Sequence, residues 1–348
     1  MDVNRYDKNE LQDIPILIAI FTYLGFALLY IMGHLRDLFI SFNFIQDKAP
    51  LDVKTKNFVP LIMDFESFYT RNLYYRMVDC WNRPIVTNAG AKIAIMERTR
   101  DNMFDPLRIN GRTIDAINMG SYNYLGFGDP LDVCSSYVNK ILLKHGISSC
   151  STYRELGYSK IIRKLERTVA SFVGKEDSIC FPIGFATNSN NIQALVDDKC
   201  CIISDELNHA SLILGSRLSN CKIFIYKHND MTDLEAILRD VIIQGRGKGH
   251  RDWKKIILIV EGIYSMEGTF VNLPAILKLK EKYKFYLYLD EAHSIGCTGR
   301  TGRGVTEYFN IDPKNIDIMM GTFTKSFGSC GGYIAASKVR RVVISENS

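Results

Sequence analysis

Two short runs in the C-terminal half of the sequence constrain the fold more than any other feature. Ile256–Val260 (IILIV) and Phe285–Leu289 (FYLYL) are aliphatic or aromatic at every position, so a strand formed by either run has hydrophobic side chains on both faces. Such strands are typical of a parallel sheet that helices cover on both sides. Because helical patterns separate the runs, the sequence predicts an α/β fold.

Further β-rich runs alternate with helical patterns beyond residue 175. The other predicted strands of this mostly parallel sheet are Cys201–Ser204, Ile223–Tyr226 and Ile316–Met320. Active sites of open parallel sheets lie at the carboxyl ends of the strands. Polar residues follow the predicted strands at Ser204–Glu206, Glu261, Asp290–His293 and Gly321–Lys325. We expect these loops to meet at one edge of the sheet.

Lys325 is the most informative of these polar residues. It lies in GTFTKSFG, Gly321–Gly328, among hydroxyl groups and aromatic rings. Glycines allow a flat group to approach, and partial burial favours the neutral lysine amine, which attacks aldehydes to form a Schiff base. Thr322 and Thr324 offer hydroxyl donors for a phosphate. Since a lone lysine in a loop is more often structural, this prediction depends on its partners.

A second segment, Leu289–Ser294, carries a carboxylate and an imidazole just after a predicted strand. Asp290 stands at the strand end and His293 follows three residues later. A buried carboxylate can keep a pyridine nitrogen protonated, which makes the ring an electron sink. The letters DEAH also occur in nucleic-acid helicases, but these need a GxxxxGK[ST] loop, and the sequence has none. The helicase reading is therefore excluded.

Two weaker segments complete the set of candidate residues. His209 lies in Ser204–Ser211, where a helix could begin, so its ring could stack on a flat group or cap the helix. Taken singly, such a histidine is more often structural. Gly184 and Phe185 follow the apolar run Ile179–Ile183, so their N–H groups could bind an anion at a helix N-terminus.

The N-terminal region contains a run that suits a membrane. Residues 14–33 carry no charge, and about 20 helical residues at roughly 1.5 Å each span the ~30 Å core of a bilayer. We expect a transmembrane helix there, with an interfacial or a buried core helix as the alternatives. The predicted organisation is a tail (1–13), this helix (14–33), a connector (34–58) and a catalytic domain (59–348).

Composition argues against several other classes of protein. None of the nine cysteines forms a CxxC pair, so we expect neither a disulfide framework nor a metal site. Lysine and arginine number 43 against 38 acidic residues, without the dense basic block of a nucleic-acid groove.

In this order, the segments resemble the α-oxoamine synthase family of fold-type I enzymes, which use pyridoxal 5′-phosphate (PLP). Three further stretches carry the resemblance: Phe68–Arg76 (FYTRNLYYR), Asp79–Pro84 (DCWNRP) and Ser121–Gly126 (SYNYLG). The likeness covers roughly residues 60 to 345. It is greatest to lysine-bearing subunits that condense L-serine with palmitoyl-CoA, with decarboxylation, to 3-ketodihydrosphingosine in sphingolipid synthesis.

The resemblance implies a role for each candidate residue. Lys325 would hold PLP and transfer protons, Asp290 would pair with the pyridinium nitrogen, and His209 would stack on the ring as a second catalytic residue. His293 would bind the phenolic oxygen of the cofactor. The phosphate would be bound by Thr322, Thr324, Gly184 and Phe185.

The resemblance also implies partners and a location. Members of this branch are single-pass proteins of the endoplasmic reticulum membrane whose catalytic body faces the cytosol. They form heterodimers with a companion subunit that lacks the lysine. The small excess of positive charge after residues 14–33 favours the same orientation.

The sequence departs from the family in two places. Tyr153 stands where the family has arginine, so we assign no substrate contact to Arg154. The sequence ends at Ser348, soon after Lys325, whereas the family continues into a smaller C-terminal domain with the arginine expected to bind serine. We expect this domain to be missing. The alternatives are a non-catalytic chain that binds the partner subunit, or another α-oxoamine synthase.

Overall fold

The structure is a computed structural model that describes residues 14–42, 44, 68–102, 105–129, 132–153 and 155–338. The chain divides into two compact units, one of residues 10–119 and the other built on residues 120–348. The predicted tail (1–13), most of the predicted connector and the predicted boundary at residue 58 lie outside the described residues.

The smaller unit begins with a long apolar helix, α1, which spans Ile16–Ser41. In the described part of the chain it is the one helix long and apolar enough to cross a membrane. It continues past the predicted end at Gly33, since neither proline nor glycine interrupts residues 34–41. A Cβ on Gly33 would lie 2.7 Å from the Phe68 ring, so glycine permits the close contact between α1 and this residue.

The rest of this unit consists of short helical turns and a hairpin. The turns are η3 (Thr70–Tyr74), α3 (Tyr75–Met77) and η4 (Val78–Cys80), and the antiparallel strands are β1 (Lys92–Thr99) and β2 (Arg108–Ile117). Arg98 of β1 connects the two parts, because its Nε donates a 3.1 Å hydrogen bond to Asp79 of η4.

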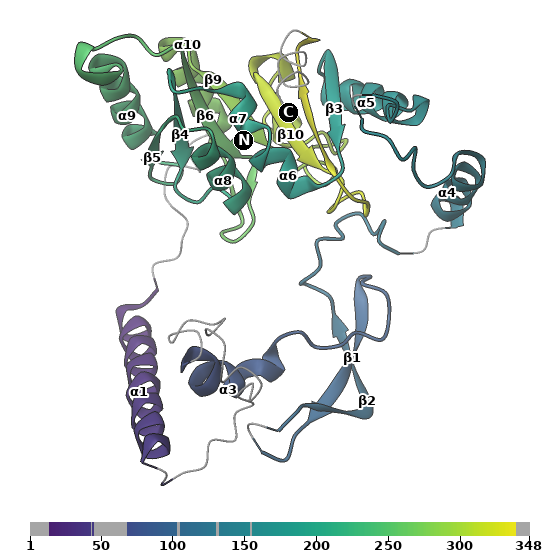
Figure 1. The fold of residues 1–348 in the computed structure, drawn as a ribbon, viewed down its shortest axis with the longest axis vertical. Coiled ribbons are helices and arrows are strands. Elements are labelled where there is room, and N and C mark those ends of the chain that lie inside the picture. The colour runs from purple at the N-terminus through teal and green to yellow at the C-terminus, as the bar shows by residue number, and fades with distance from the viewer. Residues whose placement is uncertain are drawn as a thin grey trace. The chain divides into compact units, whose positions relative to one another are not determined.

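The larger unit is built on a seven-stranded sheet in the order β3-β11-β10-β9-β6-β4-β5 (Figure 1). Strand β11 pairs antiparallel with both of its neighbours, and the other pairs are parallel. The strands are β3 (Asp177–Phe181), β4 (Cys200–Asp205), β5 (Lys222–Tyr226), β6 (Lys255–Glu261), β9 (Tyr286–Asp290), β10 (Ile318–Thr322) and β11 (Gly332–Ala336).

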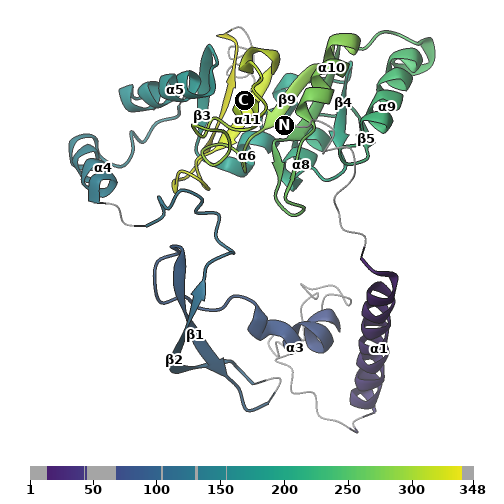
Figure 2. The same cartoon turned by 180° about the vertical axis from the view of Figure 1, so that it is seen from behind.

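Helices connect the strands and cover the sheet, as Figures 1 and 2 show from opposite sides. They are α5 (Lys160–Val173), α6 (Gly184–Ser189), α7 (Ile192–Leu195), α8 (Ala210–Leu218), α9 (Met231–Gln244), α10 (Leu273–Tyr283) and α11 (Val305–Tyr308), whereas α4 (Asp132–His145) precedes the first strand of the sheet. The remaining elements are a hairpin, β7 (Ile263–Tyr264) and β8 (Thr269–Phe270), and two 3₁₀ turns, η5 (Gly247–Gly249) and η6 (Pro313–Asn315).

The core lies on both faces of this sheet. Leu258 and Val260 of β6 belong to a hydrophobic cluster with residues of α5, α9 and α10. Ile257 and Ile259, which alternate with them, belong to a second cluster with residues of α7 and α8. Because successive side chains of a strand point to opposite faces, this arrangement explains why β6 is apolar throughout.

The predicted α/β class with a mostly parallel sheet is confirmed. Strands β4, β5, β6, β9 and β10 coincide with the predicted runs, with shifts at their ends. The sequence analysis did not predict β11, whose five residues, GYIAA, are mostly small and resemble a loop.

Truncation of Leu258 tests the two-sided core. This side chain is fully buried, so Leu258→Ala is expected to lower the free energy of unfolding by about 2–5 kcal/mol. Ile225→Ala is the control, since Ile225 of β5 is 64% exposed. Urea denaturation of the two variants measures the difference, and equal losses would contradict the account of the core.

Candidate active site

The carboxyl ends of four neighbouring strands form the rim of the candidate site. In the sheet order β10, β9, β6 and β4, the last residues are Thr322, Asp290, Glu261 and Asp205. Because these strands run parallel, all four polar side chains stand at one edge of the sheet. All four residues are buried, with 1 to 4% of their surface exposed. The loops after the strands bring the other candidate residues to this edge.

Lys325 and His293 contact each other at the rim. Lys325 Nζ lies 2.7 Å from His293 Nε2, and His293 Nδ1 lies 2.9 Å from the hydroxyl of Tyr124. The imidazole is 7% exposed. When Lys325 donates to Nε2, the ring proton stays on Nδ1 and is donated to the Tyr124 oxygen.

The surroundings weaken the charged forms of both groups. Burial lowers the pKa of His293 to about 4, and the positive charge of Lys325 acts in the same direction. Burial also lowers the pKa of the Lys325 amine, while the charges of Asp290 and Glu261 oppose this shift. The site thus combines a neutral imidazole with an amine that loses its proton more easily than a solvated lysine.

Asp290 is held by two donors. One oxygen accepts a 2.7 Å bond from the Asn188 amide, and the other accepts a 2.8 Å bond from the Ala292 N–H. Tyr288 in turn donates to the Asn188 oxygen at 2.7 Å, which fixes the amide orientation. Burial nevertheless raises the pKa of Asp290 above its ordinary value.

His209 begins α8 and joins the same network. Its Nδ1 accepts a 3.2 Å bond from the Ser211 N–H and so caps the helix. The Ser211 hydroxyl lies 2.8 Å from this nitrogen and accepts from the Asn188 amide at 2.9 Å. Ser211 and Asn188 therefore connect His209 to Asp290. The His209 ring itself is exposed.

Thr322 and the first turn of α6 lie against each other. A Cβ on Gly184 would lie 2.7 Å from the Thr322 hydroxyl, so glycine permits this approach. Thr322 Oγ1 lies 2.8 Å from Thr324 Oγ1 and donates to the Gly331 carbonyl at 2.9 Å. The first N–H groups of a helix have no intrahelical acceptor, which holds for Gly184 and Phe185 at the start of α6.

The candidate residues thus form three contact groups. Lys325 contacts His293, the amide of Asn188 links Asp290 to His209, and Thr322 contacts Thr324 and approaches Gly184. The described contacts include no hydrogen bond between these groups. No cluster of acidic, cysteine or histidine side chains among the described residues could hold a metal ion.

The sequence analysis assigned no role to three residues of the site. Asn188 contacts Asp290, and Tyr124 contacts His293. Glu261 is the last residue of β6 and lies opposite Asp290 of β9. Tyr124 and Glu261 fall in segments that the sequence analysis singled out, and Asn188 follows Gly184 and Phe185 by a few residues, but only the fold shows what they contact. Tyr153, which replaces the family arginine, donates to the buried Glu166, and Arg154 lies outside the described residues.

Comparisons with known proteins agree with this fold. The family model for aminotransferase class I and II matches residues 114–346. Serine palmitoyltransferase 2 of Caenorhabditis elegans is 49% identical, over 97% of this chain and 61% of that protein. Serine palmitoyltransferase 2 of Dictyostelium discoideum is 46% identical, over 96% of this chain and 68% of that protein.

A solved structure of SPT with PLP is similar in three dimensions. The TM-score is 0.61 at 28% identity, and the match covers 73% of this chain and 60% of the solved chain. This chain spans about three fifths of the length of the first curated relatives, 61% in both cases.

The contact between Lys325 and His293 predicts a measurable shift. Lys325→Met removes a positive charge beside the ring, so the pKa of His293 is expected to rise from about 4. An NMR titration of the ligand-free protein measures this pKa. Lys278→Met, at an exposed position of α10, is the control and should leave it unchanged. An unchanged His293 pKa in Lys325→Met would contradict the contact.

Proposed function

Because this chain belongs to the class I and II aminotransferase family and to the serine palmitoyltransferases within it, we propose that it is a lysine-bearing catalytic chain of serine palmitoyltransferase. It condenses L-serine with palmitoyl-CoA and uses PLP. The observation that carries the proposal is the pairing of Lys325 with His293 at the rim that also holds the buried Asp290.

The residues at the rim fit PLP by their chemistry. Lys325 is a half-buried amine with a lowered pKa, which suits an aldehyde. Asp290 is a buried carboxylate, which suits a pyridinium nitrogen. The hydroxyls of Thr322 and Thr324 and the N–H groups of Gly184 and Phe185 suit a phosphate.

Each residue has a defined task in the reaction. Bound PLP withdraws electrons from the bonds to the α-carbon of an amino acid. Lys325 holds the cofactor, and its amine, beside the neutral His293, takes and returns the proton of the substrate α-carbon. His293 would bind the phenolic oxygen of the cofactor, and the Tyr124 hydroxyl, 2.9 Å from Nδ1, orients the imidazole for this contact.

His209 and Asp290 hold the cofactor from two directions. The exposed ring of His209 stacks on the cofactor face and stays oriented, because its Nδ1 caps α8. The carboxylate of Asp290 pairs with the pyridinium nitrogen, and the Asn188 amide keeps it aligned. Serine supplies the α-carbon and loses its carboxylate as CO₂, palmitoyl-CoA supplies the acyl group and loses its thiol, and 3-ketodihydrosphingosine remains.

The helix α1 anchors the chain in a membrane. Its 26 residues have a mean hydropathy of 2.2 over the most apolar window, and their side chains are largely exposed in the described chain. We place it in the endoplasmic reticulum as a single span, with the catalytic body in the cytosol. The partner is a companion subunit without the lysine, in a heterodimer.

Borohydride reduction tests the role of Lys325. Reduction of the full chain with bound PLP should fix the cofactor to the peptide that contains Lys325, because only a covalent bond to an amine is trapped in this way. Peptide mapping by mass spectrometry identifies the modified residue. In Lys325→Ala both the modification and the serine-dependent activity should be lost, and Lys278→Ala should retain both. A cofactor still fixed at the same extent in Lys325→Ala would contradict the proposal.

Two substitutions of His209 separate its two roles. His209→Asn keeps a side chain that caps α8 but removes the ring, so PLP affinity should fall about 2- to 10-fold, which corresponds to about 0.5–1.5 kcal/mol of stacking. His209→Phe keeps the ring but loses the cap, so affinity should be retained while stability falls by about 1 kcal/mol. Fluorescence titration with PLP and thermal unfolding measure the two effects. The reverse pattern would argue against stacking.

A further inference from the structure

Four buried carboxyl groups lie close together at the rim. Asp205, Glu261 and Asp290 end the adjacent strands β4, β6 and β9, and Glu291 follows directly. Each is at most 4% exposed. Like charges this close and this deeply buried cannot all remain ionised, so at least one group holds a proton near neutral pH. The number of hydrogen-bond donors around each carboxyl group indicates which one.

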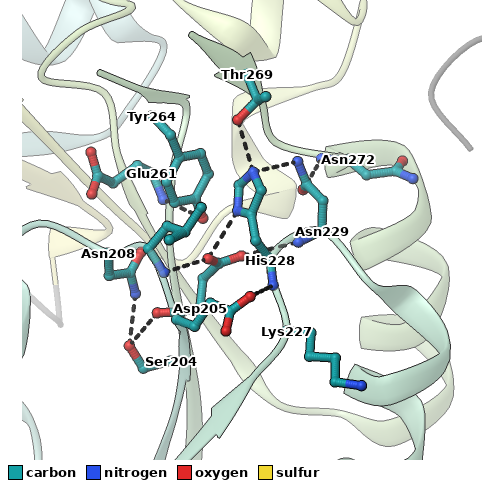
Figure 3. Close-up of polar contacts among 12 residues, drawn as sticks. Ser204, Asp205, Asn208, Lys227, His228, Asn229, Glu261, Tyr264, Thr269 and Asn272 are labelled. Carbon is teal, nitrogen blue, oxygen red and sulfur yellow. Dashed lines mark hydrogen bonds and ion pairs between the residues drawn. The ribbon is translucent and has the colours of Figure 1, made fainter. Parts of the chain in front are cut away.

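Asp205 has the most hydrogen-bond partners of the four (Figure 3). Its Oδ1 accepts from the Leu207 N–H at 3.0 Å and lies 3.0 Å from His228 Nδ1. Its Oδ2 accepts from the Asn229 N–H at 3.3 Å. His228 is held in place from its other side, since its Nε2 lies 2.8 Å from the Thr269 hydroxyl.

Asp290 comes next in the number of donors. The Asn188 amide and the Ala292 N–H each donate to one of its oxygens, and the positive charge of Lys325 also favours its ionised form. Glu291 accepts from the Val305 N–H at 3.0 Å and from the Ser294 hydroxyl, away from the strand ends. Both groups thus have two donors.

Glu261 has one donor among the described residues, the backbone N–H of His209, which bonds to Oε1. Its own N–H donates to the Tyr264 hydroxyl oxygen at 3.3 Å, and the contacts of the described residues include no hydrogen bond from this hydroxyl to the carboxyl group. In Figure 3 the carboxyl group of Glu261 points away from His228. Glu261 also stands directly opposite Asp290 in the register of β6 and β9.

The charges around Glu261 agree with this comparison. Burial, followed by repulsion from Asp290, raises the pKa of Glu261 to about 8, and Asp205 acts in the same direction. The His209 N–H and the charge of Lys325 oppose the shift without cancelling it. Glu291 shares this environment, and burial raises its pKa to about 7.

We propose that Glu261 is a protonated positioning residue. As a neutral acid it accepts the His209 N–H through Oε1, which fixes the start of α8 and with it the imidazole at the rim. Because Glu261 holds the proton, Asp290 remains ionised, and its carboxylate would face the cofactor nitrogen. The role of the cofactor rests on the proposed function, whereas the protonation of Glu261 depends on this chain alone.

The pH dependence of stability tests the protonation without cofactor. A glutamate loses its proton at about pH 4.3 in the unfolded chain and at about pH 8 here, so wild-type stability should fall as the pH rises between these values. Glu261→Gln mimics the neutral acid and removes this dependence. In the absence of cofactor, the difference between the two unfolding midpoints, Glu261→Gln minus wild type, should therefore increase as the pH is raised from about 5 to about 8. Glu281→Gln, at an exposed position of α10, should show no such trend.

PLP affinity tests the positioning role separately. Glu261→Gln should bind PLP within a few-fold of wild type, because the amide oxygen still accepts the His209 N–H. Glu261→Ala removes this acceptor and should bind PLP more weakly. If neither wild type nor any variant binds PLP, the proposed function is contradicted, but the pH dependence of stability still tests the protonation of Glu261.

Two outcomes would overturn the inference. One is a difference in unfolding midpoint, Glu261→Gln minus wild type, that stays constant or decreases as the pH rises. This result would mean that Glu261 is ionised in the folded protein. The other is the absence of a protonated-acid carbonyl band from the infrared difference spectrum of wild type minus Glu261→Gln at pH 7, or an equal band in the spectrum of wild type minus Glu281→Gln. If Glu261→Gln does not fold, the wild-type spectrum alone is compared at pH 7 and above pH 8, where this band should weaken.

Discussion

The parallel pairing of β10, β9, β6 and β4 is the constraint on which the site depends. It brings the carboxyl ends of four strands to one edge, so Thr322, Asp290, Glu261 and Asp205 stand in a row although they are far apart in the sequence. The apolar strand interiors bury this row. Burial makes unpaired charge unfavourable there, which is why each carboxyl group is supported by donors or competes for a proton.

The same burial prepares the site for chemistry. It favours the neutral form of His293 and weakens the charged form of Lys325, two groups that contact each other. Hydrogen bonds from Asn188 then connect the carboxylate of Asp290 to the helix start at His209. Stability and reactivity therefore have one origin, since the core that holds the strands together also sets the protonation of the residues at their ends.

Much of this arrangement could be predicted from the sequence. The runs IILIV and FYLYL indicate strands that are buried on both faces, and the polar residues after them indicate the edge where the site lies. The contacts could not be predicted, because Asn188 is 102 positions from Asp290 and Tyr124 is 169 from His293. Strand β11 also escaped prediction, since its small residues carry no strong strand pattern.

Decarboxylation that requires both substrates is the central claim of this account. The direct measurement is release of labelled CO₂ from carboxyl-labelled L-serine by the full chain, together with the proposed companion subunit and PLP. The account predicts release that depends on palmitoyl-CoA and that yields the ketone product in equal amount. Release without palmitoyl-CoA, or none with both substrates present, would contradict it.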